Sequence, residues 1–431
     1  MRVIEIKRDV YLKQLIEKQG NGMVKIITGV RRSGKSYLLF ELFRQYLLSN
    51  GVEEEQIVAL SLDDDENVEL LDPMNLSRFL KSKIVDNEKM FYILLDEAQL
   101  AITKDEYKGK GMVRLYSILN SLLKRRNVDI YITGSNSKFL SSDILTEFRG
   151  RGDEIRVHPL SFAEFMSVYP GDSYSGYREY SLYGGLPYIT TMKTAEQKEK
   201  YLSDLFKNTY LRDIIERYDL RGDIVMDTLV DILSSNIATL TNPTKLANSF
   251  MSHSIKTNAN TISTYIDYLI DAFIISKAQR YDIKGKKFIG SPFKYYFEDI
   301  GLRNARLNFR QIEPTHAMEN ILYNELIMRG FNVDIGVVEK YIKNNKGQNS
   351  ISLLEVDFIC NKGSQRYYVQ SAYSIPDASK MEQEQASFDR IDDSFKKVIV
   401  VQDNIAPWHN EKGYLIINLL DFLLNPNSLE L

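Results

Sequence analysis

Hydrophobic residues in the first third of the chain form short runs that alternate with longer amphipathic segments. Four runs of five or six residues, rich in branched and aromatic side chains, predict strands: Val24–Thr28, Ile57–Leu62, Phe91–Leu95 and Asp129–Thr133. In the segments between them, apolar residues recur every three or four positions, which predicts helices: Ser36–Leu48, Leu76–Ile84 and Val113–Lys124. This alternation predicts an α/β fold in which helices cover both faces of a parallel sheet.

The pattern changes after residue 155. Residues 156–205 hold three prolines and the pair Gly184–Gly185, as expected of a connector or lid. Helical periodicity then dominates up to residue 273, and Ile274–Tyr296 predicts a hairpin that turns at Lys284–Gly285. The remainder mixes a helix with short strands. We therefore predict four parts of the chain, with the boundaries 1–155, 156–205, 206–300 and 301–431.

The composition excludes several classes of protein. The chain has 431 residues, 44% hydrophobic and 26% charged, which is a globular balance and too long for one core of ordinary size. Its net charge of −3 excludes a protein that coats nucleic acid by bulk charge, but not a local basic patch. One cysteine and four scattered histidines give neither a disulfide framework nor a zinc-site spacing. Without a secretion signal or a long apolar run, we expect a soluble, cytoplasmic protein with no membrane partner.

Residues 29–36 read Gly-Val-Arg-Arg-Ser-Gly-Lys-Ser, which matches the phosphate-binding P-loop GxxxxGK[ST]. A predicted strand leads into this loop and a predicted helix leads out of it. Backbone N–H groups would face the phosphates of ATP, Lys35 would neutralise them, and the Ser36 hydroxyl would bind Mg²⁺. The alternative is a glycine-rich turn without chemistry. The predicted nucleotide contacts are Gly29, Val30, Arg31, Arg32, Ser33, Gly34, Lys35, Ser36 and Tyr37.

Two acidic residues follow the third predicted strand, at the edge of the sheet where ligands bind in parallel α/β folds. Asp96 is predicted to complete the Mg²⁺ shell, and Glu97 to orient and polarise the attacking water. An acidic pair after a strand is a weak signal by itself. Together with a P-loop, it favours hydrolysis of ATP over mere storage of the nucleotide.

Further polar residues follow the fourth predicted strand. Ser135 or Asn136 is predicted to touch the γ-phosphate or its water, and the alternative is a cap for a helix that begins near residue 137. The segment Phe-Arg149-Gly-Arg151 then places two arginines on a turn. Either arginine would stabilise transition-state charge, in its own subunit or in a neighbouring one, unless it forms an ordinary surface charge pair.

Six segments, GVRRSGKS, LLDEAQ, TGSNS, FRGR, HPLSFAEF and YGGLP, together resemble the AAA-superfamily ATPases of bacteria and archaea that carry a C-terminal domain of unknown function. TYLRDIIER at 209–217 and KYYFEDIGLRNA at 294–305 extend the likeness over nearly the whole chain. The resemblance implies an ATPase core at 1–155, a winged-helix segment within 206–300, and a tail at 301–431 similar to restriction-endonuclease-like folds.

Residues 275–310 carry nine basic side chains against three acidic ones. A helix expected at Thr261–Asp271 precedes this basic hairpin, and a helix followed by a wing is a common way to grip a duplex. Lys284, Lys286 and Lys287 at the turn are predicted to contact DNA phosphates, which would give affinity that falls with salt rather than sequence specificity. The alternative is a solvated face on an interdomain module.

The tail carries an incomplete nuclease pattern. PD-(D/E)xK nucleases place an Asp on one strand and E-x-K on the next, so that the acids hold a metal and the lysine assists. Asp357 matches the first position and Glu319 could join it, but the E-x-K positions read Gln370-Ser-Ala372. Gln cannot supply the anionic charge and Ala cannot replace an ammonium group. We therefore predict a degenerate nuclease fold that serves binding or assembly.

Together these features predict an ATP-hydrolysing motor or switch that uses ATP and Mg²⁺. Its C-terminal half would engage double-stranded DNA or a protein partner, or mediate self-association. The predicted catalytic residues are Lys35, Glu97, Arg149 and Arg151. A second hypothesis is a nucleotide-gated scaffold or defence sensor with little turnover. A third, an ATP-fuelled Mg²⁺-dependent nuclease, is disfavoured by the residues at 370 and 372.

Overall fold

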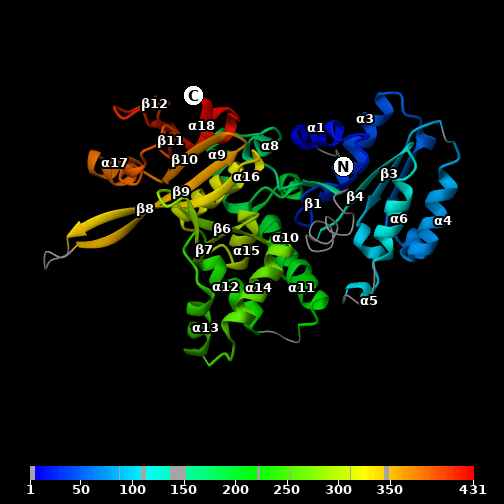
Figure 1. Ribbon diagram of the computed structural model, residues 1–431, viewed down its shortest axis with the longest axis horizontal. Coiled ribbons are helices and arrows are strands. Elements are labelled where there is room, and N and C mark those ends of the chain that lie inside the picture. The colour runs from blue at the N-terminus through cyan, green and yellow to red at the C-terminus, as the bar shows by residue number, and fades with distance from the viewer. Residues whose placement is uncertain are drawn as a thin grey trace. The chain divides into compact units, whose positions relative to one another are not determined.

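A computed structural model describes residues 5–86, 88–107, 113–135, 152–220, 224–252, 254–310, 312–343 and 349–431. The chain divides into two compact units. Unit 1 comprises Met1–Pro159 with Asp271–Phe273, and unit 2 comprises Leu160–Ile270 with Ile274–Leu431. The elements of each unit can be followed by their labels in Figure 1.

A five-stranded sheet, in which every pairing is parallel, forms the centre of unit 1. The strand order is β2-β3-β4-β1-β5, so β4 lies between β1 and β3. This order matters for the site, because the carboxyl ends of these three strands then lie side by side. The strands are β1 (Val24–Thr28), β2 (Ile57–Ser61), β3 (Phe91–Asp96), β4 (Val128–Thr133) and β5 (Gly152–Arg156).

Helices cover both faces of this sheet. Successive side chains of a strand point to opposite faces, and here both sets are largely apolar, so each face needs a layer of helices to bury it. Ile26 of β1 belongs to a core cluster with residues of α4 and α6, whereas Ile27 belongs to a second cluster with residues of α1 and α3. A π-helical turn (Leu38–Phe43) joins α2 to α3 in one helical segment. The helices are α1 (Asp9–Glu17), α2 (Lys35–Tyr37), α3 (Arg44–Ser49), α4 (Pro73–Lys83), α5 (Lys104–Tyr107) and α6 (Arg114–Leu122).

The four strands and three helices predicted for this part are confirmed, with small differences at their ends. The sequence did not predict β5. Its residues include Asp153 and Glu154, so it lacks the apolar run of the other strands. It is an edge strand, and its Glu154 accepts a hydrogen bond from Thr28 Oγ1 at 2.6 Å.

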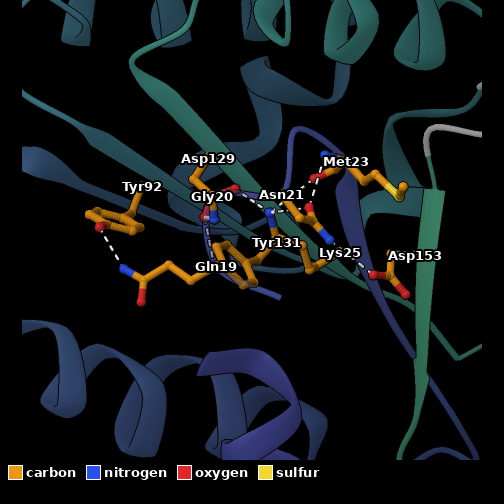
Figure 2. Close-up of polar contacts among 9 residues, drawn as sticks. All are labelled: Gln19, Gly20, Asn21, Met23, Lys25, Tyr92, Asp129, Tyr131 and Asp153. Carbon is orange, nitrogen blue, oxygen red and sulfur yellow. Dashed lines mark hydrogen bonds and ion pairs between the residues drawn. The ribbon is translucent and has the colours of Figure 1, made fainter. Parts of the chain in front are cut away.

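A polar network closes the amino ends of the strands (Figure 2). Lys25 of β1 is fully buried and forms an ion pair with Asp129 of β4. Asp129 also accepts hydrogen bonds from the N–H of Gly20 at 2.9 Å and from the Tyr131 hydroxyl at 2.8 Å. Lys25 Nζ donates further to the carbonyl of Met23 at 3.0 Å. These bonds fasten the loop between α1 and β1 to the sheet.

Unit 2 begins with helices, and the segment predicted as a connector is itself helical, with α8, α9 and α10. In the part of the chain that the structure describes, no helix is long and apolar enough to cross a membrane. The helices are α8 (Phe162–Met166), α9 (Ser173–Tyr183), α10 (Ala195–Leu205), α11 (Arg212–Arg217), α12 (Ile224–Ser235), α13 (Pro243–Ser252), α14 (Ala259–Asp271), α15 (Ile300–Arg306), α16 (Pro314–Met328), α17 (Ala378–Gln385) and α18 (Leu419–Leu424).

The strands of unit 2 form an eight-stranded sheet with the order β12-β13-β11-β10-β9-β8-β6-β7. The predicted hairpin is confirmed as β6 and β7, and it belongs to the same sheet as the tail. β8 and β9 are longer than predicted and project together as a hairpin (Figure 1). The strands are β6 (Ile275–Asp282), β7 (Lys287–Phe297), β8 (Asn332–Lys343), β9 (Asn349–Lys362), β10 (Gln365–Ala372), β11 (Lys396–Val401), β12 (Trp408–His409) and β13 (Leu415–Asn418).

Two motifs that carry the family resemblance meet inside unit 2. Asp299, which caps α15, accepts a hydrogen bond from the N–H of Gly185 at 2.7 Å. Gly184 has a φ of 76°, and a Cβ on it would lie 2.1 Å from the Asp299 carboxylate. The glycine pair and Asp299 therefore require each other, which gives a packing reason for both motifs.

Candidate nucleotide-binding site

The candidate site lies at the carboxyl ends of β1, β3 and β4. The loop Gly29–Gly34 follows β1, Asp96 ends β3, and Thr133 ends β4. Because β4 lies between the other two strands, Thr133 can contact residues that follow both. This is the edge of a parallel sheet where ligands are expected.

Two glycines give the loop after β1 its shape. Gly34 is left-handed, with a φ of 96°, and directly precedes α2. Gly29 has a φ of 135°, and a Cβ there would lie 2.1 Å from the carbonyl oxygen of Val157. Any side chain at residue 29 would therefore displace the backbone after β5.

Lys35 is the first residue of α2 and is buried, with 4% of its surface exposed. Its Nζ donates to the carbonyl oxygens of Gly29 and Val30, both at 3.0 Å. Burial lowers the pKa of Lys35 to about 8, although Glu97 and Asp96 act in the opposite direction. The ammonium therefore lies in a desolvated place near acids to which no described hydrogen bond joins it.

Asp96 is buried at the end of β3, where Thr133 Oγ1 donates a hydrogen bond to its carboxylate. Burial raises the pKa of Asp96, while hydrogen bonds from Thr133 and Ser36 counteract that rise. The predicted pair of Ser36 and Asp96 is thus brought together by the fold.

Glu97 has the left-handed backbone conformation, with φ 50° and ψ 44°. Its N–H donates to Thr133 Oγ1 at 3.0 Å. Its carboxylate accepts a hydrogen bond from Gln99 Nε2 and lies 3.4 Å from the Ser135 hydroxyl. Among the described contacts, the Asp96 carboxylate thus bonds Thr133 at the end of β4, whereas the Glu97 carboxylate lies beside Ser135, two residues further on.

Comparisons with known proteins agree with this geometry. Residues 21–166 match the family model of an AAA domain, and residues 174–313 match that of a domain of unknown function, DUF8612. An uncharacterised protein of Haemophilus influenzae is 33% identical over 424 residues, which span 97% of this chain and 98% of that protein. The chain carries an AAA domain and belongs to the same family as the Haemophilus protein.

Two further proteins are similar to this chain. An uncharacterised protein of Methanocaldococcus jannaschii is 26% identical over 392 residues, which cover 87% of this chain and 79% of that protein. A solved structure described as a Walker-type ATPase of Pyrococcus abyssi is 14% identical and covers 70% of this chain and 96% of that chain, with a TM-score of 0.49.

The residues of the AAA domain fit a Mg²⁺-nucleotide. A buried ammonium without a bonded carboxylate suits an anion such as a phosphate, and a hydroxyl beside a carboxylate offers the oxygen ligands that Mg²⁺ prefers. Val30, Ser33 and Gly34 form the loop, Arg31 and Tyr37 are half-buried beside it, and Arg32 is exposed with a φ of 67°. The predicted site residues Asn136, Arg149 and Arg151 lie outside the described residues.

Three residues that support the site, Thr133, Gln99 and Arg8, were not predicted from the sequence. Thr133 and Gln99 contact Asp96 and Glu97, and their signal is position alone, because each lies at or just after a strand end. Arg8 is buried and donates to the carbonyl oxygens of Ser33 at 3.0 Å and His158 at 2.6 Å. Arg8 thus joins the P-loop to the backbone after β5, and no local pattern identifies it.

The basic hairpin is less basic on its surface than the sequence indicates. Lys284, Lys286 and Lys287 are exposed at the turn between β6 and β7, as predicted. Of the nine basic residues at 275–310, however, four are buried or ion-paired within unit 2: Arg280, Lys294, Arg303 and Arg306. Arg306, for example, pairs with Asp231 of α12 at 2.6 Å. Counting charges along the chain therefore overstated the basic surface.

Proposed function

We propose that this AAA protein binds ATP with Mg²⁺ and hydrolyses it. The observation that carries the proposal is Lys35, whose buried ammonium is bonded to backbone carbonyls of the P-loop rather than to a carboxylate. A desolvated cation of this kind has a strong need for an anionic ligand. The γ-phosphate of ATP would supply it, and Asp96 and Glu97 lie near the same ammonium.

Each residue has a role that follows from its place. Lys35 and the backbone N–H groups at the start of α2 would hold the phosphates. Ser36 and Asp96 would hold Mg²⁺, which when bound polarises phosphate oxygens and neutralises their charge. Glu97 would accept the proton of the attacking water, beside the Ser135 hydroxyl. Asn136, Arg149 and Arg151 stay predictions, the arginines as groups that stabilise transition-state charge.

A specific observation favours a second candidate function, a nucleotide-gated scaffold with little turnover. Gln99 already donates a hydrogen bond to the carboxylate of Glu97. This bond uses an acceptor position of the carboxylate that a general base would otherwise offer to the attacking water. As long as it persists, the site would bind ATP and hydrolyse it slowly.

Glu97→Gln separates the two candidates. The amide keeps the shape of the side chain and loses its charge, so turnover should fall by about 10²-fold while ATP still binds. The matched control is Glu66→Gln, an exposed carboxylate in unit 1 that should leave turnover unchanged. Slow turnover that is equal in the wild type and Glu97→Gln would favour the scaffold. Loss of ATP binding in Glu97→Gln would place Glu97 in the metal shell or the fold.

We also propose that residues 206–300 contain a winged-helix unit that contacts double-stranded DNA. Three helices, α12, α13 and α14, precede the hairpin, and Thr241 between the first two forms an isolated antiparallel bridge with Phe293 of β7. A strand that lies between the first two helices and pairs with the last strand of a hairpin is the order of a winged helix. A protein partner or self-association is the alternative use of this unit.

The lysines of the turn test the DNA proposal. Replacing Lys284, Lys286 and Lys287 with Ala should weaken duplex binding and reduce the slope of log affinity against log salt by roughly one unit for each phosphate that a lysine had neutralised. The exposed lysines Lys193, Lys200 and Lys207 provide a triple-Ala control of equal charge. Equal losses in the two variants would indicate bulk charge rather than the hairpin. Absence of duplex binding by the wild type at low salt would favour a protein partner.

For the tail, we propose a degenerate restriction-endonuclease-like fold at 301–431. The support is the order helix, three antiparallel strands, helix, parallel strand, formed by α16, β8–β10, α17 and β11. The division at residues 155, 205 and 300 stays part of this proposal. Measuring ATP turnover with and without duplex DNA tests whether the ATPase part and the C-terminal half act together. Stimulated turnover supports a motor or switch, and cut DNA would support a nuclease.

A further inference from the structure

Unit 2 contains a cluster of charged side chains in which the sequence had brought together only Asp357 and Glu319. Lys294 of β7 lies between two glutamates, with its Nζ 2.8 Å from Glu319 of α16 and 2.6 Å from Glu355 of β9. Asp357, two residues after Glu355, is buried beside them and accepts a hydrogen bond from the N–H of Ser371 at 2.7 Å. Three carboxylates from two elements thus surround one ammonium.

This cluster is largely shielded from water. The side chain of Lys294 is 5% exposed and that of Glu319 is 9% exposed, whereas Glu355 is 33% exposed and forms the outer side. Buried carboxylates at such short separations repel each other unless a cation lies between them. Burial alone would lower the pKa of Lys294, but Glu319, Asp357 and Glu355 together raise it above its ordinary value. The lysine therefore stays charged and supplies that cation.

The position of the ammonium is set by the fold rather than by a flexible side chain alone. Asn320, next to Glu319, bonds both the N–H and the carbonyl of Phe297 in β7, at 2.7 and 2.8 Å. Tyr296, also on β7, donates to Glu319 at 2.7 Å and stacks on Tyr323 of α16. These bonds hold β7 against α16, so the backbone that carries Lys294 is fixed beside Glu319.

A divalent metal would have to use the space that the lysine fills. Carboxylate oxygens bind Mg²⁺, Mn²⁺ or Ca²⁺ at about 2.0–2.6 Å, and a shared ion must lie between them. Here the ammonium already lies between Glu319 and Glu355. In the described residues, no group of three or more His, Cys, Asp or Glu side chains is arranged to hold a metal ion.

We propose that Lys294 is the permanent cation of this carboxylate cluster, that it excludes a divalent metal from the tail, and that it fastens the β6–β7 hairpin to α16 and β9. The ammonium that is missing from β10, where Ala372 stands, is thus supplied from another strand, but in contact with the acids instead of beside a metal. Resting on the proposed restriction-endonuclease-like fold, this assignment means that the lysine occupies the place between the acids where such a nuclease would hold its metal. This inference does not depend on ATP hydrolysis.

The test measures binding of Mn²⁺ to the full chain, without nucleotide, in the wild type and in variants of the cluster. Two readouts report the binding: the midpoint of thermal unfolding and the electron paramagnetic resonance signal of free Mn²⁺. The wild type should show no stabilisation that depends on Asp357. Lys294→Met should unfold at a lower temperature, and millimolar Mn²⁺ should raise its midpoint by at least about 2 °C. Adding Asp357→Asn to Lys294→Met should abolish that rise. The P-loop site is the same in all variants, so it cancels from the comparison.

Lys294→Arg serves as the matched control, because it keeps the positive charge and should remain indifferent to Mn²⁺. Lys294→Arg is also useful if Lys294→Met fails to fold. Mn²⁺ binding by the wild type and by Lys294→Arg can then be compared with Mn²⁺ binding by Asp357→Asn. Binding of Mn²⁺ by the wild type that Asp357→Asn removes would overturn the proposal, as would cleavage of DNA that depends on Asp357. A folded Lys294→Met that ignores Mn²⁺ would also overturn it, because the lysine would not then fill a cation position.

Discussion

The parallel sheet of unit 1 buries one lysine near each of its two ends, and the surroundings of these side chains differ. Lys25, at the amino end, is paired with the buried carboxylate of Asp129. Lys35, at the carboxyl end, donates to two backbone carbonyls, while Asp96 and Glu97 bond other groups. Burial lowers the pKa of both lysines.

The difference distinguishes a structural charge from a binding charge. At the amino end, every described bond of Lys25 and Asp129 is to a group of the sheet or its adjoining loop, so the pair is complete without a ligand (Figure 2). At the carboxyl end, Lys35 has acids nearby, but its described bonds are to backbone carbonyls and not to a carboxylate. Burial alone therefore does not identify a functional lysine; the identity of its partner does.

Asp129→Ala gives the largest expected effect and tests the structural end. It would leave Lys25 buried without its carboxylate, which should lower the free energy of unfolding by about 3–5 kcal/mol. Denaturant unfolding measures this loss. The double change Lys25→Met with Asp129→Leu removes both charges and should regain most of the stability. If Asp129→Ala is as stable as the wild type, the ion pair at the amino end does not stabilise the fold, and the proposed difference between the two buried lysines is wrong.

Lys35→Ala is expected to have the next largest effect, and in the opposite sense. It should weaken ATP binding by about 10²-fold, since a charged partner of the phosphates is removed. The unfolding midpoint should stay level or rise, because a buried charge without a bonded carboxylate is removed. Titration calorimetry and thermal unfolding measure the two quantities. Unchanged ATP binding would contradict the nucleotide-site assignment, and a large drop in stability would make Lys35 structural like Lys25.

The pH dependence of ATP binding gives a smaller effect. The pKa of Lys35 is about 8 in the free protein, and bound phosphates would raise it, so binding above pH 8 should take up a proton. Affinity should then fall by up to about tenfold per pH unit as the pH rises above 8. Calorimetry in two buffers of different ionisation enthalpy measures the uptake.

The Lys25→Met, Asp129→Leu variant is the control for this experiment, because it leaves the ATP end intact and should take up the same proton. In the free protein, the charged form of Lys35 is disfavoured by folding. Its contribution to stability should therefore improve as the pH rises from about 8 towards the ordinary value of 10.5. Binding that is flat between pH 7.5 and 9.5 would contradict the lowered pKa.

Much of unit 1 could be predicted from the sequence, because its strands are apolar runs and its helices have a regular period. β5 could not be predicted, since an edge strand with Asp153 and Glu154 has no apolar run. In unit 2 the hairpin was predicted, but its membership of the tail's sheet was not, because strand order depends on contacts between distant segments. The same holds for the supports of the site, since Arg8 and His158 are 150 residues apart.

The basic hairpin shows the limit most clearly. Its lysines at the turn stayed exposed as predicted, since a turn holds side chains away from the sheet. Lys294 lies only seven positions beyond Lys287 in the same strand, yet it is buried among carboxylates. Counting charges along the chain does not separate these two lysines, although Lys294 precedes an aromatic run and Lys287 follows another lysine at the turn.

The sequence by itself determined the P-loop, the acidic pair after β3 and the AAA fold class, because each is a contiguous pattern whose residues meet through backbone geometry. The tertiary structure alone decided which charges are partners. Lys25 finds Asp129 across 104 residues, and Lys294 finds Glu319 across 25. The free energy of a charge depends on burial and on distance to other charges, and both quantities are defined only once the chain has folded.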